Sequence, residues 1–222
     1  MFFVLILITA VPAYILGSVN GAIITSKAFF RKDIREYGSG NPGLTNFYRV
    51  FGKGGFLLVL LIDVVKTIAP VMFGGWLFAH FFDMVLTEVG PLHRFFDLAY
   101  FGQVLAGFFV MLGHCFPLFY KFKGGKGVMA IGAIVIVVDW RLALISWGVF
   151  ILITLLTRYV SLGAMLGSMA FSASMFLFNV GGIAEHTIVI MCVLLVIIRH
   201  IPNIKRLFKG EESKLKLKRT KG

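Results

Sequence analysis

Hydrophobic residues occur along this chain in long runs that few polar residues interrupt. A helix rises about 1.5 Å per residue, so roughly 20 apolar residues are needed to cross the hydrocarbon core of a bilayer. By this measure the pattern predicts helical spans over residues 1–30, 56–82, 98–116, two within 128–157, 160–178 and 183–198. The predicted fold class is therefore all-α, a polytopic integral membrane protein with about seven transmembrane helices.

The shortest of these runs, residues 128–138, is followed by Asp139, Trp140 and Arg141, which are expected to form a turn. A segment of this length has to tilt, thin the bilayer, lie partly buried or re-enter from one side. Five full spans are the alternative if the short pieces only dip into the membrane. In the second run, Asp63 and Lys66 are three residues apart and hence on one helix face, where each can partly neutralise the other.

The basic residues predict the orientation, because positively charged loops are retained in the cytoplasm. With the N-terminus outside and the C-terminus cytoplasmic, nineteen of the 22 Lys and Arg lie inside: six in residues 27–53, three in 121–126, one at 158 and nine in 199–221. Residues 1–210 are then a single integral membrane domain, and 211–222 are a basic cytoplasmic tail. We expect this tail either to lie against anionic lipid or to serve as a solvated topology anchor.

The amino-acid composition excludes several other classes of protein. The chain is 59% hydrophobic and 14% charged over 222 residues, with a net charge of +12, which leaves no room for a separate water-soluble domain and excludes a disordered chain. Its two cysteines, Cys115 and Cys192, both lie in apolar runs. The sequence therefore supports neither a disulfide framework nor a cysteine metal cluster.

The first polar segment, residues 37–49, is rich in glycine and small hydrogen-bonding side chains. Three glycines let backbone N–H groups converge, and Ser39, Asn41, Thr45 and Asn46 add polar side chains, so the loop can wrap an anion. A tight cytoplasmic turn would use the same residue types. Arg49 favours the anion site, because a guanidinium one helical turn after Thr45 suits bidentate phosphate binding.

The second polar segment, residues 113–127, places three lysines within six residues and glycines between them. The spacing indicates phosphate binding, but it is not a Walker loop, because Gly127 follows Lys126 where Ser or Thr is required. A basic loop with His114 at the membrane interface is the alternative. In the third segment, residues 199–212, the side chains of His200, Asn203 and Arg206 recur every three residues and can share one face of a short helix.

These residues give the chain a specific resemblance to a known family. The blocks are Gly-Ser-Gly-Asn-x-Gly-x-Thr-Asn-x-x-Arg at 38–49, Gly-His-x-x-Pro…Phe-Lys-Gly-Gly-Lys-Gly-Val at 113–128 and His-x-x-Asn-Ile-x-Arg-Leu at 200–207. Together they resemble the bacterial acyl-phosphate:glycerol-3-phosphate acyltransferases, the PlsY family, over nearly the whole chain. Leu44 and the pair Met129-Ala130 depart from the family pattern and bear on local packing and acyl-chain fit.

The resemblance implies transfer of a fatty acyl group from acyl phosphate to the 1-hydroxyl of sn-glycerol 3-phosphate, giving lysophosphatidic acid and phosphate. It also implies an active site facing the cytoplasm at the bacterial inner membrane, contact with membrane lipid, a link to a soluble acyl-phosphate-forming enzyme, and no cofactor, metal or nucleic acid. The catalytic residues expected on this basis are Ser39, Arg49, Lys123, Lys126 and Asn203, with the choice between the two lysines open. The expected substrate-binding residues are Gly38, Gly40, Asn41, Thr45, Asn46, His114, Gly124, Gly125, Ser161, His200 and Arg206.

The mechanism expected from the residues is electrostatic. Lys and Arg can stabilise the charge on a departing phosphate. His93 and Asp97 are four residues apart in an external loop and make no convincing general-base pair. A phosphate oxygen of the donor is therefore expected to take the hydroxyl proton, with Ser39 as a covalent nucleophile the competing mechanism.

Two other classes of protein fit part of the pattern. An organophosphate transporter would also use an intramembrane pair such as Asp63 and Lys66 and an anion-binding loop. Against it, the two halves of the chain do not pair as an inverted repeat, and the phosphate-type segments cluster on one side. A membrane scaffold would leave the three polar segments unexplained.

Overall fold

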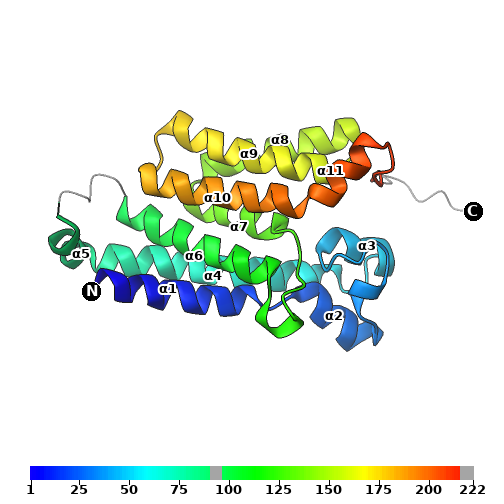
Figure 1. Ribbon diagram of the computed structural model, residues 1–222, viewed down its shortest axis with the longest axis horizontal. Helices are drawn as coiled ribbons and strands as arrows, with labels where there is room; N and C mark the ends of the chain where they lie inside the picture. Colours follow the sequence, from blue (N-terminus) through cyan, green and yellow to red (C-terminus); the bar gives the residue numbers. More distant parts are fainter. Residues whose placement is uncertain (91–96, 216–222) are drawn as a thin grey trace, which may run out of the picture.

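Helices form every regular element in residues 1–90 and 97–215, the part of the chain that the computed structural model describes (Figure 1). The α-helices are α1 Phe2–Gly17, α2 Gly21–Phe30, α3 Leu44–Phe51, α4 Phe56–His80, α5 Phe82–Val89, α6 Leu98–Cys115, α7 Val128–Val138, α8 Trp140–Thr157, α9 Val160–Phe178, α10 Ile183–Arg199 and α11 Ile201–Phe208. Two short 3₁₀ helices, η1 Ile34–Glu36 and η3 Leu118–Tyr120, lie in the connecting segments.

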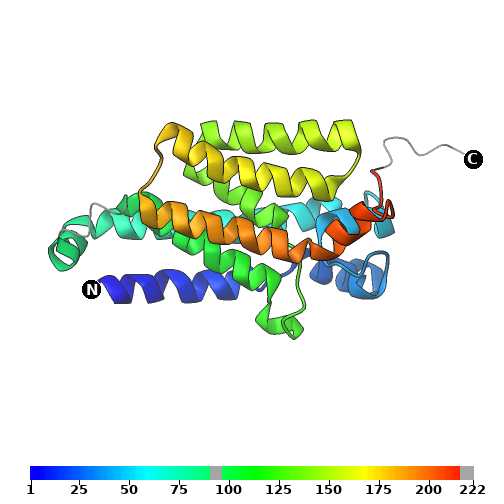
Figure 2. The ribbon, with the colours of Figure 1, turned by 45° about the horizontal axis from the view of Figure 1, so that its top comes forward.

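The long helices run side by side along the long axis of the molecule (Figures 1 and 2). Helix α4 packs against α1, α6 and α7, whereas α8 pairs with α9. Gly74 and Gly102 allow α4 and α6 to approach closely, because a Cβ on Gly102 would lie 2.1 Å from the Gly74 carbonyl oxygen. Such small-residue contacts are typical of helices packed in a membrane.

Among the described residues, five helical stretches are long and apolar enough to cross a bilayer: Phe2–Phe30, Phe56–His80, Leu98–Tyr120, Trp140–Thr157 and Val160–Phe178. A sixth is added if α10 and α11, which meet at a bend of 53°, form one span. Helix α7 has 11 residues and is too short to cross by itself. The predicted all-helical, multi-pass membrane fold is confirmed, while the count of seven stays a prediction.

Two local expectations differ from the structure. The run over residues 1–30 contains two helices, because α1 ends at Gly17 and Asn20 caps α2 by accepting a hydrogen bond from the Ile23 N–H. The predicted turn at Trp140 and Arg141 is wrong, since α8 already begins at Trp140. Asp139 alone makes the turn, and its carboxylate accepts a hydrogen bond from the Arg141 N–H as an N-cap.

The three polar segments lie at the same end of the bundle. Figure 1 shows α2, α3 and α11 at that end, together with the segment between α6 and α7 and the turn between α8 and α9. The N-terminus and α5 lie at the opposite end. The alternation of the helices therefore brings residues 31–55, 116–127 and 199–215 together.

Candidate active site

A cavity of about 710 Å³ lies where the polar segments meet. Four of the residues predicted for the site, Gly40, Lys123, Gly124 and Gly125, do not line it. The other twelve do, and they come from distant parts of the sequence: Gly38, Ser39, Asn41, Thr45, Asn46, Arg49, His114, Lys126, Ser161, His200, Asn203 and Arg206.

The first segment is shaped by one buried amide. The Asn46 side chain accepts a hydrogen bond from the Ser39 N–H at 2.9 Å and donates one to the Tyr37 carbonyl at 3.0 Å. These bonds fold the glycine-rich loop back onto α3, whose next turn carries Arg49. Because both ends of the amide are used, Asn46 builds the loop, while Thr45 and Arg49 present their side chains to the cavity.

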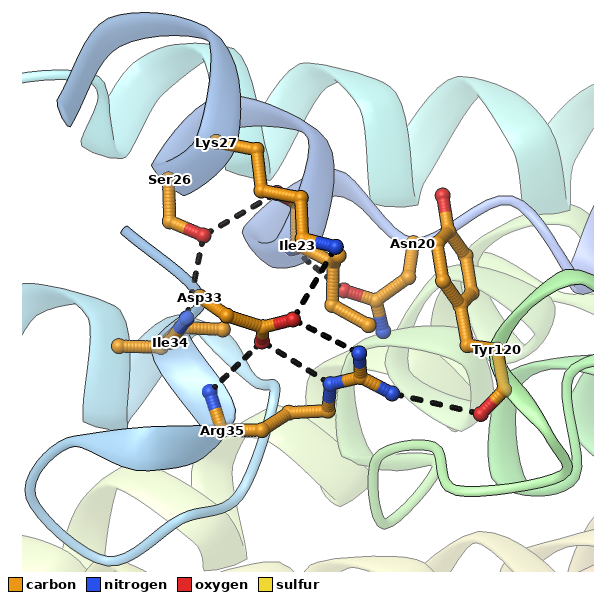
Figure 3. A network of polar contacts seen from close by, with 8 residues as sticks. All are labelled: Asn20, Ile23, Ser26, Lys27, Asp33, Ile34, Arg35 and Tyr120. Atoms are coloured by element: carbon orange, nitrogen blue, oxygen red, sulfur yellow. Dashed lines mark hydrogen bonds and ion pairs between the residues drawn. The ribbon is translucent and has the colours of Figure 1, made fainter. Parts of the chain in front are cut away.

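An ion-paired arginine connects the turn that precedes the first segment to the second segment (Figure 3). Arg35 donates to both carboxylate oxygens of Asp33, at 2.9 and 2.7 Å, and its remaining terminal nitrogen donates to the Tyr120 carbonyl at 3.3 Å. Lys27 pairs with the same carboxylate at 3.2 Å. The hydrogen bond from Arg35 holds the pKa of the Asp33 carboxyl well below its usual range, so Asp33 is a fixed anion in this structural clamp.

Lys126 is the lysine of the second segment that reaches the cavity. Its ammonium donates a hydrogen bond to the Asn203 side-chain oxygen at 2.5 Å. Burial, together with the nearby Arg206 cation, lowers the pKa of Lys126 to about 8. Lys123, by contrast, is exposed and outside the lining, so the geometry favours Lys126 over Lys123.

The adjoining glycines seat this loop. The Gly124 and Gly125 carbonyls accept hydrogen bonds from the Arg199 guanidinium at 2.8 and 3.0 Å, and the Gly125 N–H donates to the His114 carbonyl. A Cβ on Gly125 would lie only 2.2 Å from His114 Nε2. The two glycines therefore allow the loop to lie against His114 and carry Lys126, and their own atoms are outside the lining.

The third segment presents three residues to the cavity: Asn203 and Arg206 of α11, and His200, the residue that precedes this helix as its N-cap. A residue that the sequence did not single out joins them. Glu212 accepts hydrogen bonds from Asn203 at 2.6 Å and from Arg206 at 2.7 Å, and its side chain is 7% exposed.

Glu212 also limits the hydrogen bonds that Ser161 can make to a substrate. The Ser161 hydroxyl donates its one hydrogen to the Glu212 carboxylate at 2.8 Å, so it is not free to donate to a phosphate oxygen in this arrangement. Burial opposes ionisation of Glu212, but the hydrogen bonds from Asn203, Ser161 and Arg206 keep the pKa of its carboxyl below its usual range. The only sequence signal for Glu212 is a carboxylate placed within a basic flank.

The cavity has a second, apolar wall. Helices α7, α8 and α9 contribute side chains that form it, among them Val128, Met129, Trp147, Phe150 and Ala164. Of the residues that depart from the family pattern, Leu44 and Met129 lie in the lining, whereas Ala130 does not. The cavity thus joins a cationic, hydrogen-bonding end to a hydrocarbon surface, which suits an amphipathic substrate that carries a phosphate.

A family model for glycerol-3-phosphate acyltransferase matches residues 7–210. The chain belongs to the glycerol-3-phosphate acyltransferase family. Curated relatives named glycerol-3-phosphate acyltransferase include those of Staphylococcus saprophyticus, 36% identical over 215 residues, and Staphylococcus carnosus, 36% identical over 217 residues. Each alignment covers 96% of this chain and 98% of the relative.

Solved structures of the family have the same fold. The glycerol 3-phosphate form of PlsY (YgiH), described as an integral membrane glycerol 3-phosphate acyltransferase, is 30% identical with a TM-score of 0.77 and covers 95% of this chain and 96% of its own. The lysophosphatidic acid form of that enzyme gives 28% identity and a TM-score of 0.76. The resemblance to the PlsY family is therefore confirmed, which favours the acyltransferase over the transporter and the scaffold.

In this member of the glycerol-3-phosphate acyltransferase family, Lys66 of α4 connects Asp63 of the same helix to His114 of α6. The predicted pair of Asp63 and Lys66 is confirmed at 2.8 Å, and the Lys66 ammonium also lies 3.0 Å from His114 Nδ1. Asp63 and His114 both line the cavity.

The sequence also offered His93 and Asp97 as an unconvincing general-base pair. His93 lies outside the described residues. Asp97 precedes α6, and its backbone N–H donates a hydrogen bond to the Glu185 carboxylate.

Proposed function

We propose that the protein transfers a fatty acyl group from acyl phosphate to the 1-hydroxyl of sn-glycerol 3-phosphate, forming lysophosphatidic acid and phosphate. The observation that carries this proposal is the single cavity in which Arg49, Lys126 and Arg206 adjoin an apolar wall. Cations and fixed donors offset the repulsion between two phosphate-bearing substrates. The apolar wall suits a fatty acyl chain. The glycerol 3-phosphate and lysophosphatidic acid forms of the related enzyme support this choice of acceptor and product.

The residues divide by what they present to the cavity. Arg49, Lys126 and Arg206 supply positive charge for the two phosphates, and Ser39, Asn41 and Thr45 supply small polar side chains. Asn203 holds the Lys126 ammonium through its side-chain oxygen. Gly124 and Gly125 act by seating the loop, and Ser161 acts through Glu212.

The proposed chemistry is substrate-assisted. The 1-hydroxyl oxygen attacks the acyl carbonyl carbon, the new ester bond forms, and the bond from that carbon to the phosphate oxygen breaks. The hydroxyl proton passes to a phosphate oxygen of the donor, so the leaving group departs as hydrogen phosphate and no external base is consumed. The two carboxylates that line the cavity favour this route, because Asp63 is paired with Lys66 and Glu212 with Arg206.

The proposed location is the bacterial inner membrane with the cavity facing the cytoplasm. The basic residues of the cavity end support it, since positively charged segments are retained inside. An acyl phosphate made by a soluble enzyme would then reach the cavity from the cytoplasm or along the lipid surface.

The test is acyl transfer by the purified full-length protein in detergent micelles. Palmitoyl phosphate and glycerol 3-phosphate are mixed with the enzyme, and both phosphate and lysophosphatidic acid are measured. Release that requires both substrates supports the proposal, and palmitoyl-CoA in place of palmitoyl phosphate tests the donor. Equal rates with palmitoyl-CoA would contradict the assignment of acyl phosphate as the donor.

A further inference from the structure

Two histidines that line the cavity are hydrogen-bonded in opposite ways through the same ring nitrogen. His114 Nδ1 lies 3.0 Å from the Lys66 ammonium, whereas His200 Nδ1 lies 2.8 Å from the Val196 carbonyl oxygen. An ammonium can only donate and a carbonyl can only accept. The partner of Nδ1 therefore decides which nitrogen of each neutral imidazole carries the proton.

For His114 the partner is Lys66, whose three ammonium hydrogens are all donated in hydrogen bonds. The Lys66 ammonium donates to the Val19 carbonyl at 2.5 Å, to Asp63 at 2.8 Å and to His114 Nδ1 at 3.0 Å, which accounts for all three of its hydrogens. The Lys66 side chain is 5% exposed, and Lys66 itself does not line the cavity. His114 Nδ1 must then be an acceptor, and the proton of the neutral ring is on Nε2.

His200 has the reverse arrangement. Its Nδ1–H donates to the Val196 carbonyl, one turn back along α10, so the neutral ring keeps a lone pair on Nε2. One cavity therefore contains an imidazole whose Nε2 is a donor and another whose Nε2 is an acceptor.

We propose that Lys66 is a positioning residue that fixes His114 as a neutral imidazole whose Nε2–H donates to an anionic oxygen of the bound phosphate substrate. This inference rests on the proposed function, because it takes the ligand to be a phosphate. Asp63 holds Lys66 in place through the ion pair. The Val19 carbonyl lies in the break between α1 and α2, where it accepts another hydrogen bond from the Lys66 ammonium. The role of Lys66 is indirect, since its ammonium lies behind the cavity wall.

His114 suits such a donor for two further reasons. It packs against the Gly124–Gly125 turn of the loop that carries Lys126, so the imidazole and the ammonium belong to one unit. A donor fixed in advance toward an anion needs no reorganisation when the charge arrives.

The experiment is ¹⁵N NMR of the full-length protein in detergent micelles, labelled at its five histidines. A His114→Gln variant identifies the His114 signals. We expect wild-type His114 to be protonated on Nε2 alone and His200 on Nδ1. Added inorganic phosphate should shift the His114 Nε2 resonance.

The variant that tests Lys66 is the pair Asp63→Asn with Lys66→Met, which removes the donor together with its counter-charge and leaves no unpaired buried ion. We expect His114 to become a mixture of tautomers and phosphate to bind about tenfold more weakly. His200 is the internal control, and its signals should not change if the variant is folded. Lys66→Arg keeps the donors and should keep the Nε2–H tautomer.

Three results would overturn the inference: wild-type His114 protonated on Nδ1, a double variant that keeps the pure Nε2–H tautomer, or phosphate that binds without moving Nε2. The first and third need only the wild-type protein, so a variant that does not fold cannot hide them. Acyl transfer measured on the same preparation separates this inference from the proposed function, because a protein without transferase activity would still report the tautomer and the phosphate response.

Discussion

Lys126 donates a hydrogen bond to Asn203 across 2.5 Å, joining two polar segments that are separated by four helices, α7 to α10, in the sequence. This contact places an ammonium against the face of α11 that lines the cavity. Lys123, three residues earlier, is exposed and does not line the cavity.

The first prediction separates the two lysines. Lys126→Met should lower kcat/KM for acyl transfer about 100-fold to 1000-fold, the range seen when one donor to a developing oxyanion is removed. Lys123→Met removes the same charge from the same loop and should change kcat/KM by about twofold or less. Steady-state phosphate release measures both, and the reverse order would assign catalysis to Lys123.

A second prediction concerns pH. Because burial and Arg206 lower the pKa of Lys126 to about 8, its ammonium is lost as the pH rises through about 8, and kcat/KM should fall in that range. Phosphate monoesters lose their second proton near pH 6, so ionisation of the substrates does not cause the fall in kcat/KM near pH 8, the alkaline limb of the profile. Lys126→Arg stays charged, and any remaining activity should lack the limb. A wild-type profile that is flat to about pH 10 would contradict the assignment.

Ser39 distinguishes the two mechanisms. The Ser39 side chain makes no hydrogen bond to a base among the described residues, although its backbone N–H is held by Asn46. Ser39→Ala should therefore retain single-turnover acyl transfer, at a rate lowered about tenfold by the loss of one hydrogen-bonding group. Rapid-quench mass spectrometry should find no acyl-serine adduct in the wild type. An adduct at Ser39 that forms and decays at the turnover rate would establish the covalent route.

The loop glycines give a steric prediction. Gly125→Ala places a Cβ 2.2 Å from His114 Nε2, so either the loop or the imidazole has to move, and we expect kcat/KM to fall about 100-fold. Gly148→Ala on α8 is the matched control, because beyond its chain neighbours and its own helix backbone no atom of the described residues lies within 4 Å of its added Cβ. Equal activity in the two variants would show that the loop does not need its close contact with His114.

The sequence predicted the helices well because crossing a bilayer demands long apolar runs, and residues 56–82 and 160–178 match α4 and α9 closely. The break between α1 and α2 lacked such a signal, since residues 18–20 interrupt the apolar run only briefly and the cap depends on where Asn20 turns. Trp140 was misassigned to a turn because a single N-cap, Asp139, is enough to reverse the chain.

Those features of the site that depend on residues close together in the sequence could be predicted. Asn203 and Arg206 are three residues apart on α11, and His200 is its N-cap, so the local sequence is enough to predict that these residues lie near one another. Glu212 and the contact from Lys66 to His114 are not local, because each joins residues that only the folded bundle brings together. A lysine exposed at position 123 and a lysine buried at 126 are likewise indistinguishable until the loop is folded.

The central claim is that the first and third polar segments line one substrate cavity, and cysteine protection tests it most directly. Thr45→Cys in the first segment and Ser213→Cys directly after the third place exposed, cavity-lining thiols in a protein whose own Cys115 and Cys192 are buried. Tyr48→Cys and Lys209→Cys are exposed controls outside the lining. We predict that glycerol 3-phosphate slows maleimide labelling at positions 45 and 213 with the same half-protecting concentration and leaves positions 48 and 209 unchanged. Protection at only one of the two lining positions, or equal protection at the controls, would contradict the account.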